Sequence, residues 1–495
     1  MSKQSSGTSD RLLVLIRRHW LFLIVIVTAS FVWTMMFIRA ATEFVANPNW
    51  PRAVWNGEGS IDIFGYTLAV HFEGWADHDY FYHSWADQFL SGRMPYTDDF
   101  NRLFRGSTEY NVIYFFPPLY VYMCALGEII HPDIGIGLLI SGFGFLTSFP
   151  VYGIATYLSQ NRDVGAVSAA MYLLNPIVLY HTAFEWLNPA PFVFFAVLSF
   201  YLVIKNRRVS GALALTTAAF FKQTAFFLAL PLVAVLLKKP PGPLEMGDDS
   251  EDTESTTKKP TSDDFDLKGF AKIAIIVLLF AGALSMPYLI DFSNYFFYIF
   301  QRVGATLLRD LTTPPPINNP ITPAVVLIIL GAPEWLIQAV NLITYYSVAL
   351  TLGILPLLAM MLLEVKDDRN LEGYWRRMLF LTLVLLFWAH FFSPRGIYKY
   401  YMVALVPFFS IMSTSAICRR EPYSARISLP MIAVPLLISF LVLVPDRNFY
   451  LLFLFLIILG YVLHKPFSEV YQRVTSPIRR LDTQIRNRAA ARNRE

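Results

Sequence analysis

Acidic and histidine side chains gather in one polar stretch of this 495-residue chain, "EGWADHDYFYHSWADQFLSGRMPYTDDF" at residues 73–100. Asp77, His78 and Asp79 follow one another there among aromatic residues. A carboxylate can take the proton of an acceptor hydroxyl as a general base, and two carboxylates can hold a divalent cation. Asp-x-Asp also occurs often in solvated loops, so catalytic acids and plain loop acids both stay open at this point.

Three cations interrupt apolar or aromatic sequence further along the chain. Lys222 stands in "AAFFKQTAFF", and Arg395 and Lys399 stand in "SPRGIYKYY". Ionisable groups at or within a membrane are costly and usually functional. Arginine binds phosphate through its planar fork and lysine as a point charge, so these cations predict a site for an anionic group. Snorkelling of the two later cations to lipid headgroups is the alternative. Further predicted contacts to a substrate are His78, Glu185 and Tyr398.

Composition places these residues in a membrane protein. The chain is 55% hydrophobic and 15% charged, whereas soluble domains carry about 25% charged residues. Its apolar runs of roughly 20 residues suit transmembrane helices and are too continuous for barrel strands. The first run, Leu21 to Ile38, is too long for a cleaved signal peptide. Cys124 and Cys418 give neither a disulfide framework nor metal-ligand spacing, and the net charge of +4 indicates inner-leaflet bias rather than nucleic-acid binding.

The positions of lysine and arginine predict the topology. Arg17 and Arg18 precede the first apolar run, so the N-terminus is expected in the cytoplasm. The later basic clusters then alternate in a way that gives about twelve spans, with both termini inside. The spans are expected near residues 20–40, 134–158, 164–181, 190–205, 211–224, 225–238, 270–290, 335–363, 376–392, 400–417, 428–444 and 448–464.

The segment from Tyr114 to Ile130 is the exception to this alternation. A full crossing here would place Arg162 outside, against the charge pattern. The adjacent Pro117 and Pro118 favour an irregular entry into the helix. We therefore predict a re-entrant or interfacial helix on the outer side.

The chain is expected to have five parts. Residues 239–268 are polar, acidic and proline-containing, so they cannot bury enough apolar area to order themselves. The basic tail either forms a helix on anionic headgroups or only fixes the topology. The parts are a cytoplasmic N-terminus at 1–19, a transmembrane module at 20–238 with an outer loop at 41–133, a disordered cytoplasmic loop at 239–268, a second transmembrane module at 269–464 and a cytoplasmic tail at 465–495.

Four blocks of sequence carry a family resemblance. Asp79, Ala86, Gly92 and Pro95, followed by "YFFPPLYVY", resemble the first outer loop of GT-C glycosyltransferases, especially the polyprenyl- or dolichyl-phosphate-sugar-dependent mannosyltransferases. The blocks "LLNPIVLYHTAFEWLNP", "GALALTTAAFFKQTAFFLALP" and "SPRGIYKYYMVALVP" resemble later parts of that family. The family's polar patch after "LNP" is basic, whereas this chain has Glu185, which leaves the substrate open.

The resemblance implies an all-α, GT-C-type transmembrane bundle with outer-side loop helices. It implies an inverting glycosyltransferase that moves a mannose-like hexose from a polyprenyl- or dolichyl-phosphate donor to a glycan, lipid or protein acceptor. Asp79 would be the base and Asp77 the second acid of the pair. No cofactor is required, although a divalent cation on these two acids stays open. The site is expected on the outer or lumenal face of a plasma membrane in a prokaryote, or of the endoplasmic reticulum in a eukaryote, in contact with membrane lipids.

Two other classes of function compete with this one. A transporter or flippase of a lipid-linked anion would also need buried cations, but it often shows internal repeats, and we find no convincing repeat. The polar residues also cluster on one side only, which favours an enzyme. A non-catalytic scaffold subunit is the third class, and the acid and cation candidates argue against it only mildly.

Overall fold

The computed structural model describes residues 8–47, 50–52, 57–63, 66–72, 75, 77–240, 265–301, 322–366, 371–393 and 396–412. All of them belong to one compact unit, Met1–Pro445. The predicted spans at 428–444 and 448–464, the tail at 465–495 and most of the acidic loop at 239–268 lie outside the described residues.

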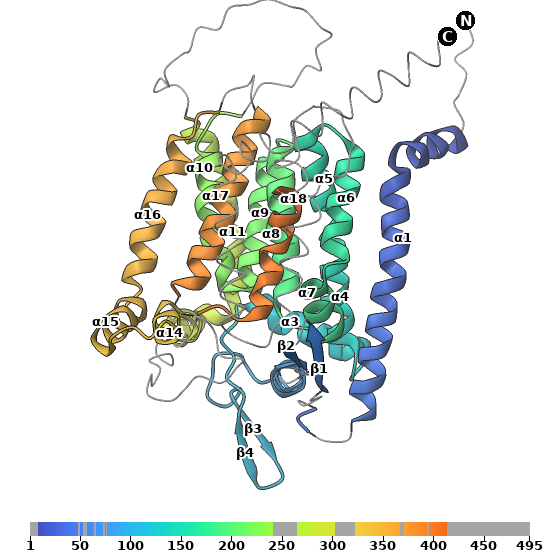
Figure 1. The fold of residues 1–495 in the computed structure, drawn as a ribbon. Helices are drawn as coiled ribbons and strands as arrows, with labels where there is room; N and C mark the ends of the chain where they lie inside the picture. Colours follow the sequence, from blue (N-terminus) through green and yellow to red (C-terminus); the bar gives the residue numbers. More distant parts are fainter. Residues whose placement is uncertain are drawn as a thin grey trace, which may run out of the picture. The chain divides into compact units, whose positions relative to one another are not determined.

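Helices dominate the described part of the chain, as predicted (Figure 1). Short 3-10 or π-helical segments are written η. The first half contains α1 (Thr8–Ala46), β1 (Gly57–Ile63), β2 (Tyr66–Phe72), η1 (His78–Tyr82), α2 (His83–Leu90), β3 (Arg102–Arg105), β4 (Thr108–Asn111), α3 (Pro118–Ile130), α4 (Gly135–Leu146), α5 (Ser148–Ser159), α6 (Arg162–Leu173), α7 (Pro176–Val178), η2 (Leu179–Phe184) and α8 (Pro189–Ile204). The second half contains α9 (Arg208–Phe221), η3 (Gln223–Leu228), α10 (Ala229–Leu236), α11 (Leu267–Ser285), η5 (Met286–Asp291), α12 (Phe292–Phe296), η6 (Phe297–Gln301), α14 (Pro323–Ile329), α15 (Glu334–Tyr345), α16 (Val348–Leu363), α17 (Leu371–Phe391), η8 (Lys399–Ala404) and α18 (Val406–Met412).

Three helical stretches of the described residues are long and apolar enough to cross a membrane: Ile16–Ala46, Gly135–Ser159 and Leu267–Phe300. The number rises to five if two bent pairs, α6 with α7–η2 and α15 with α16, each form one span. The prediction of about twelve spans is therefore not confirmed. Several predicted spans are short helices, such as α8 with 16 residues and α9 with 14. At about 1.5 Å per residue these reach roughly 21–24 Å, less than the ~30 Å of a bilayer core.

The hairpin of α9 and α10 shows which helix ends lie together. Arg208 at the start of α9 donates to the carbonyls of Leu236 and Lys238 at the end of α10, and it pairs with Asp266 at 2.6 Å before α11. The turn at the other end of the hairpin holds Lys222, as the sequence predicted. This turn lies at the same end of the helices as α2 and α3. We call this end the α2–α3 end.

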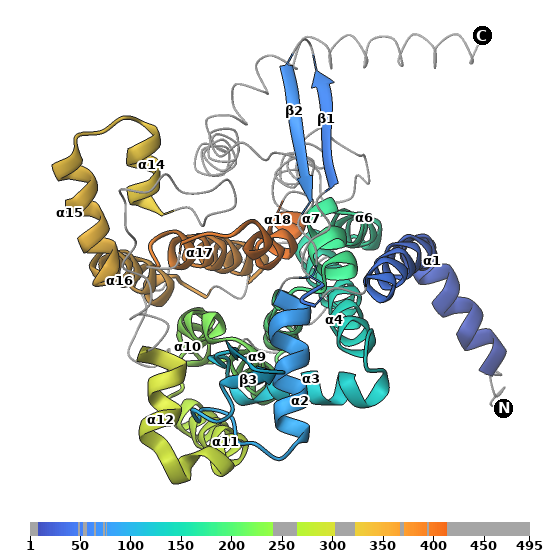
Figure 2. The same ribbon diagram turned by 90° about the horizontal axis from the view of Figure 1, so that it is seen from below.

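The segment predicted to be re-entrant or interfacial forms α3, a 13-residue apolar helix that is too short to span. It begins at Pro118, where a proline at the first helical positions costs no backbone hydrogen bond. Seen from below, α2 and α3 run across the end of the other helices rather than along them (Figure 2). The interfacial form of the prediction agrees with this placement, while the side of the membrane on which it lies stays a prediction.

Two antiparallel hairpins correct the expectation of an all-α chain. Strands β1 and β2 pair from Gly57 with Phe72 to Ile63 with Tyr66. Strands β3 and β4 pair across a two-residue turn that begins at Gly106, whose φ of +62° lies in the left-handed region that glycine favours. Both hairpins fall in the predicted outer loop, where apolar composition gave no signal for strands.

Candidate functional site

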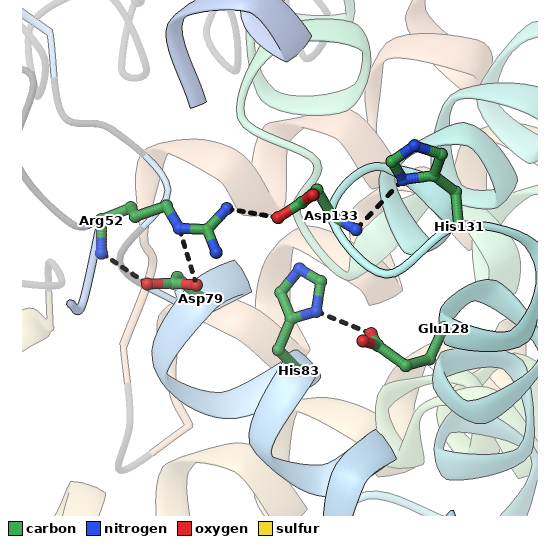
Figure 3. Close-up of polar contacts among 6 residues, drawn as sticks. All are labelled: Arg52, Asp79, His83, Glu128, His131 and Asp133. Atoms are coloured by element: carbon green, nitrogen blue, oxygen red, sulfur yellow. Dashed lines mark hydrogen bonds and ion pairs between the residues drawn. The ribbon is translucent and has the colours of Figure 1, made fainter. Parts of the chain in front are cut away.

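Arg52 joins two acids from distant parts of the chain (Figure 3). Its backbone N–H donates to Oδ2 of Asp79 at 2.5 Å, and its Nε lies 3.7 Å from Oδ1 of the same carboxylate. Its Nη1 donates to Oδ1 of Asp133 at 2.9 Å, in the turn between α3 and α4. The guanidinium also lies over the ring of Phe44, 4.3 Å from its centroid. We call Arg52, Asp79 and Asp133 the Arg52 node; it fixes the chain after α1 onto η1 and the α3–α4 turn.

Two histidines of the same helical stretch pack beside this node. Nδ1 of His83 lies 2.7 Å from Oε2 of Glu128 on α3. His78 is fully buried, its ring 4.8 Å from that of His83 and 4.9 Å from that of Trp186, and neither of its nitrogens has a hydrogen bond within the described residues. Burial holds the pKa of His78 well below its ordinary value, and the charges of His83 and Arg52 lower it further. His78 is therefore a buried ring packed among other rings, and its predicted role as a substrate contact stays a prediction.

The geometry bears on the predicted roles of the two acids. Asp79 is 2% exposed and binds the guanidinium and a backbone N–H at once. A general base needs a lone pair within reach of the acceptor hydroxyl, whereas here both carboxylate oxygens already face Arg52. Asp77, two residues before Asp79, is partly buried. Burial raises the pKa of Tyr82 well above its ordinary value, and the charge of Asp77 raises it further. The arrangement suits a structural ion-pair network.

A second polar cluster surrounds Lys222. Its Nζ donates to Oδ1 of Asn188 at 2.6 Å, and Nδ2 of Asn188 donates to the hydroxyl of Tyr82 at 3.1 Å. The ammonium lies 4.4 Å from the ring centroid of Tyr401 and 5.5 Å from that of Tyr400. Lys222, Asn188, Tyr82 and the two tyrosines form what we call the Lys222 node, which joins the α9–η3 turn, the start of α8, η1 and η8.

The remaining predicted site residues fall around this second node. Glu185 pairs with Nδ1 of His181 at 2.5 Å, both side chains are buried, and the histidine ring is 6.4 Å from that of Tyr400. Tyr398 packs its ring 5.5 Å from the same tyrosine. Arg395 and the side chain of Lys399 lie outside the described residues. The structure thus places Lys222, Glu185 and Tyr398 around the two tyrosines, Asp79 in the Arg52 node and His78 beside that node.

In the part of the chain that the structure describes, no group of three or more histidine, cysteine, aspartate or glutamate side chains could hold a metal ion. A divalent cation on Asp77 and Asp79 stays untested.

Sequence reasoning missed Arg52, Asp133, Glu128 and Tyr82. The rule that flagged Lys222, a cation on the predicted outer side, also applies to Arg52 in "NWPRAVW" and would have found it. The acids and the tyrosine carried no such signal, because their partners lie 45 to 106 residues away in the sequence.

These features define a class of protein: a mostly helical chain with candidate membrane spans, whose described helices carry two partly buried polar nodes at one end. A family model described as GPI transamidase subunit PIG-U matches residues 104–316, which is less than half of the chain. No curated protein matches the chain. The matched segment runs from β3 past η6 and contains Asn188 and Lys222.

The match corrects the predicted function. The family is a subunit of a GPI transamidase and not a GT-C mannosyltransferase family. The predictions of a glycosyltransferase, of a polyprenyl- or dolichyl-phosphate sugar donor with its acceptors, and of a transporter or flippase are therefore wrong. The reason is physical: aromatic residues are enriched at membrane interfaces and lysine reaches the headgroups there, so blocks rich in both do not specify one reaction.

Proposed function

We propose that this chain is a membrane-embedded, non-catalytic subunit of a GPI transamidase, in the endoplasmic reticulum membrane of a eukaryotic cell. The observation that carries the proposal is the family match over residues 104–316. Its partners would then be the other subunits of that complex and the proteins that receive the anchor. Of the three classes considered from the sequence, the scaffold subunit is the one that agrees with this match.

The polar nodes support a structural role for the chain within such a complex. The acids of the Arg52 node face a guanidinium, and the Lys222 ammonium is 6% exposed among aromatic rings and an amide. Charged groups that bind one another in this way fix the positions of the segments that carry them. They therefore hold the loops of the α2–α3 end in one arrangement, which a subunit needs in order to present a constant surface to its partners.

Cys124, the cysteine within the described residues, also supports a non-catalytic role. Cys124 lies on α3 and is fully buried, and burial raises the pKa of its thiol well above its ordinary value. A thiol of this kind is a poor nucleophile, because the reactive form is the thiolate. Cys124 is therefore not expected to act as a nucleophile, whereas Cys418 lies outside the described residues.

Purification from membranes tests this proposal. The full chain, tagged at its C-terminus and produced in eukaryotic cells, should co-purify the other transamidase subunits in mild detergent at a constant ratio. A matched control is the same chain with Phe104→Ser, a change at an exposed side chain of β3, which should give the same ratio. A chain that is monodisperse, membrane-integrated and free of these subunits would overturn the proposal.

A further inference from the structure

Helix α15 meets α16 at a sharp break. The two helices are bent by 61°, and Ser347 between them has a φ of +56°, in the left-handed region. α16 runs from this break to Glu364, whose carbonyl accepts from Lys238 at the end opposite to the α2–α3 end. α15 therefore lies at the α2–α3 end of α16 and points away from its axis, where Figure 1 shows it.

The exposed face of α15 is apolar along one stripe. Trp335 is 71% exposed, Leu342 54% and Ile343 44%. Their spacing of i, i+7 and i+8 puts them on one side of an α-helix. Glu334 and Gln338 form the polar edge of this stripe, where the amide donates to the carboxylate at 2.9 Å. A helix with an apolar stripe, a polar edge and a tryptophan has the pattern of a helix that lies in the membrane interface.

The neighbouring surface and the charge of α15 identify what covers the stripe. The exposed side chains of α16 next to it, Leu352 and Leu355, are also apolar, so the stripe continues a surface suited to lipid. α15 has no lysine or arginine and one acid, Glu334. Anionic cytoplasmic leaflets attract basic helices, so a helix of this composition suits a leaflet that is poor in anionic lipid.

We propose that α15 lies along the bilayer surface, with Trp335, Leu342 and Ile343 inserted at the boundary between headgroups and acyl chains of a weakly charged leaflet. α15 and α16 then do not form one bent span, and α15 is not the first half of a re-entrant loop; the break at Ser347 separates a surface helix from the helix that follows it. The inference is independent of the transamidase proposal, because it rests only on the bend, the exposed stripe and the charge of α15.

Spin-label accessibility in nanodiscs of zwitterionic lipid tests this placement. Single-cysteine variants Leu342→Cys and Gln338→Cys, in a background without other reactive cysteines, are compared with Leu355→Cys on α16 and Phe104→Cys on β3. The label at 342 should collide with oxygen several-fold more than with a water-soluble nickel chelate, approaching the label at 355. The label at 338, on the polar edge, should lie between 342 and the water-exposed label at 104.

Two results would overturn the inference. A label at 342 that meets the nickel chelate as often as the label at 104 would place the stripe in water. A label at 342 that meets neither reagent would mean that protein covers the stripe. A fluorophore attached at Leu342→Cys provides an independent measure of depth. Lipids brominated near the headgroup should quench it, and lipids brominated near the chain ends should not. Quenching by lipids brominated near the chain ends would make α15 part of a span.

Discussion

Replacing Asp79 with asparagine distinguishes a structural from a chemical role for the Arg52 node. Asp79→Asn keeps the shape and the acceptor for the backbone N–H of Arg52 but removes the negative charge. If the node is structural, the variant loses stability, and Arg52→Gln shows the same defect because it breaks the same pair. If Asp79 transfers a proton instead, Asp79→Asn loses activity alone.

The expected size of the effect follows from the geometry. At 3.7 Å between Nε and Oδ1, two unit charges attract by about 4 kcal/mol at an effective dielectric constant of about 20. The desolvation of a carboxylate that is 2% exposed opposes much of this. Arg52 also keeps Asp133 at 2.9 Å in the variant. We therefore expect a loss of about 1–3 kcal/mol in the free energy of unfolding.

The assay is thermal melting of the detergent-solubilised chain, followed by size-exclusion chromatography of the soluble fraction. Asp79→Asn and Arg52→Gln should each lower the melting temperature, and the double variant should lower it by less than the sum of the two. Asp99→Asn is the matched control, since Asp99 pairs with Arg93 at 3.5 Å and is 75% exposed. The reasoning is refuted if Asp79→Asn melts like the parent and still abolishes anchor attachment while Arg52→Gln is silent in both assays.

Three further changes test the packing of the same region. Lys222→Ala should lower the melting temperature by the equivalent of about 2–4 kcal/mol, because it leaves a cavity and leaves the amide of Asn188 without its donor. Lys222→Met fills more of the space and should cost less. Equal melting temperatures for both variants and the parent would contradict a stabilising role of the Lys222 node. Gly137→Ala should cost about 1–3 kcal/mol, because the added methyl overlaps the indole of Trp186, whereas Gly142→Ala has open space and should be neutral in the same melting assay. Burial lowers the pKa of His78 in the folded chain. As pH falls below about 6.5, the unfolded chain therefore takes up a proton that the buried ring does not, and the free energy of unfolding should fall by up to about 1.4 kcal/mol per pH unit. His78→Phe should flatten this slope in melts from pH 7 to 5.

Helix positions were predictable because apolar runs of the right length have few other structures open to them. The run expected at 134–158 is the stretch Gly135–Ser159, and the Lys222 turn of the predicted hairpin is where α9 ends. The number of crossings was not predictable in the same way. It depends on length and bending, and sequence hydropathy does not register the bend in the pair of α15 and α16.

The candidate site was only partly predictable, since it depends on which distant groups meet. Residue type correctly marked Lys222 as unusual, but it gave no sign that Asn188 and Tyr401 would surround it. Asp79 was identified as chemically notable for its type and setting, whereas its role depends on Arg52, a residue 27 positions away. A carboxylate that accepts a proton and one that binds a guanidinium look alike in sequence.

Functional replacement is the most direct test of the central claim. A eukaryotic cell line that lacks its own subunit of this family, and therefore fails to display a GPI-anchored reporter, is supplied with this chain, and surface reporter is measured by flow cytometry after correction for expression. We expect the chain to restore display of the reporter and to incorporate into the transamidase complex in the same cells. The claim that this chain is a transamidase subunit would be contradicted by one result. In that result the chain is expressed and integrated into membranes, yet it binds no detectable amount of the other subunits and restores no reporter.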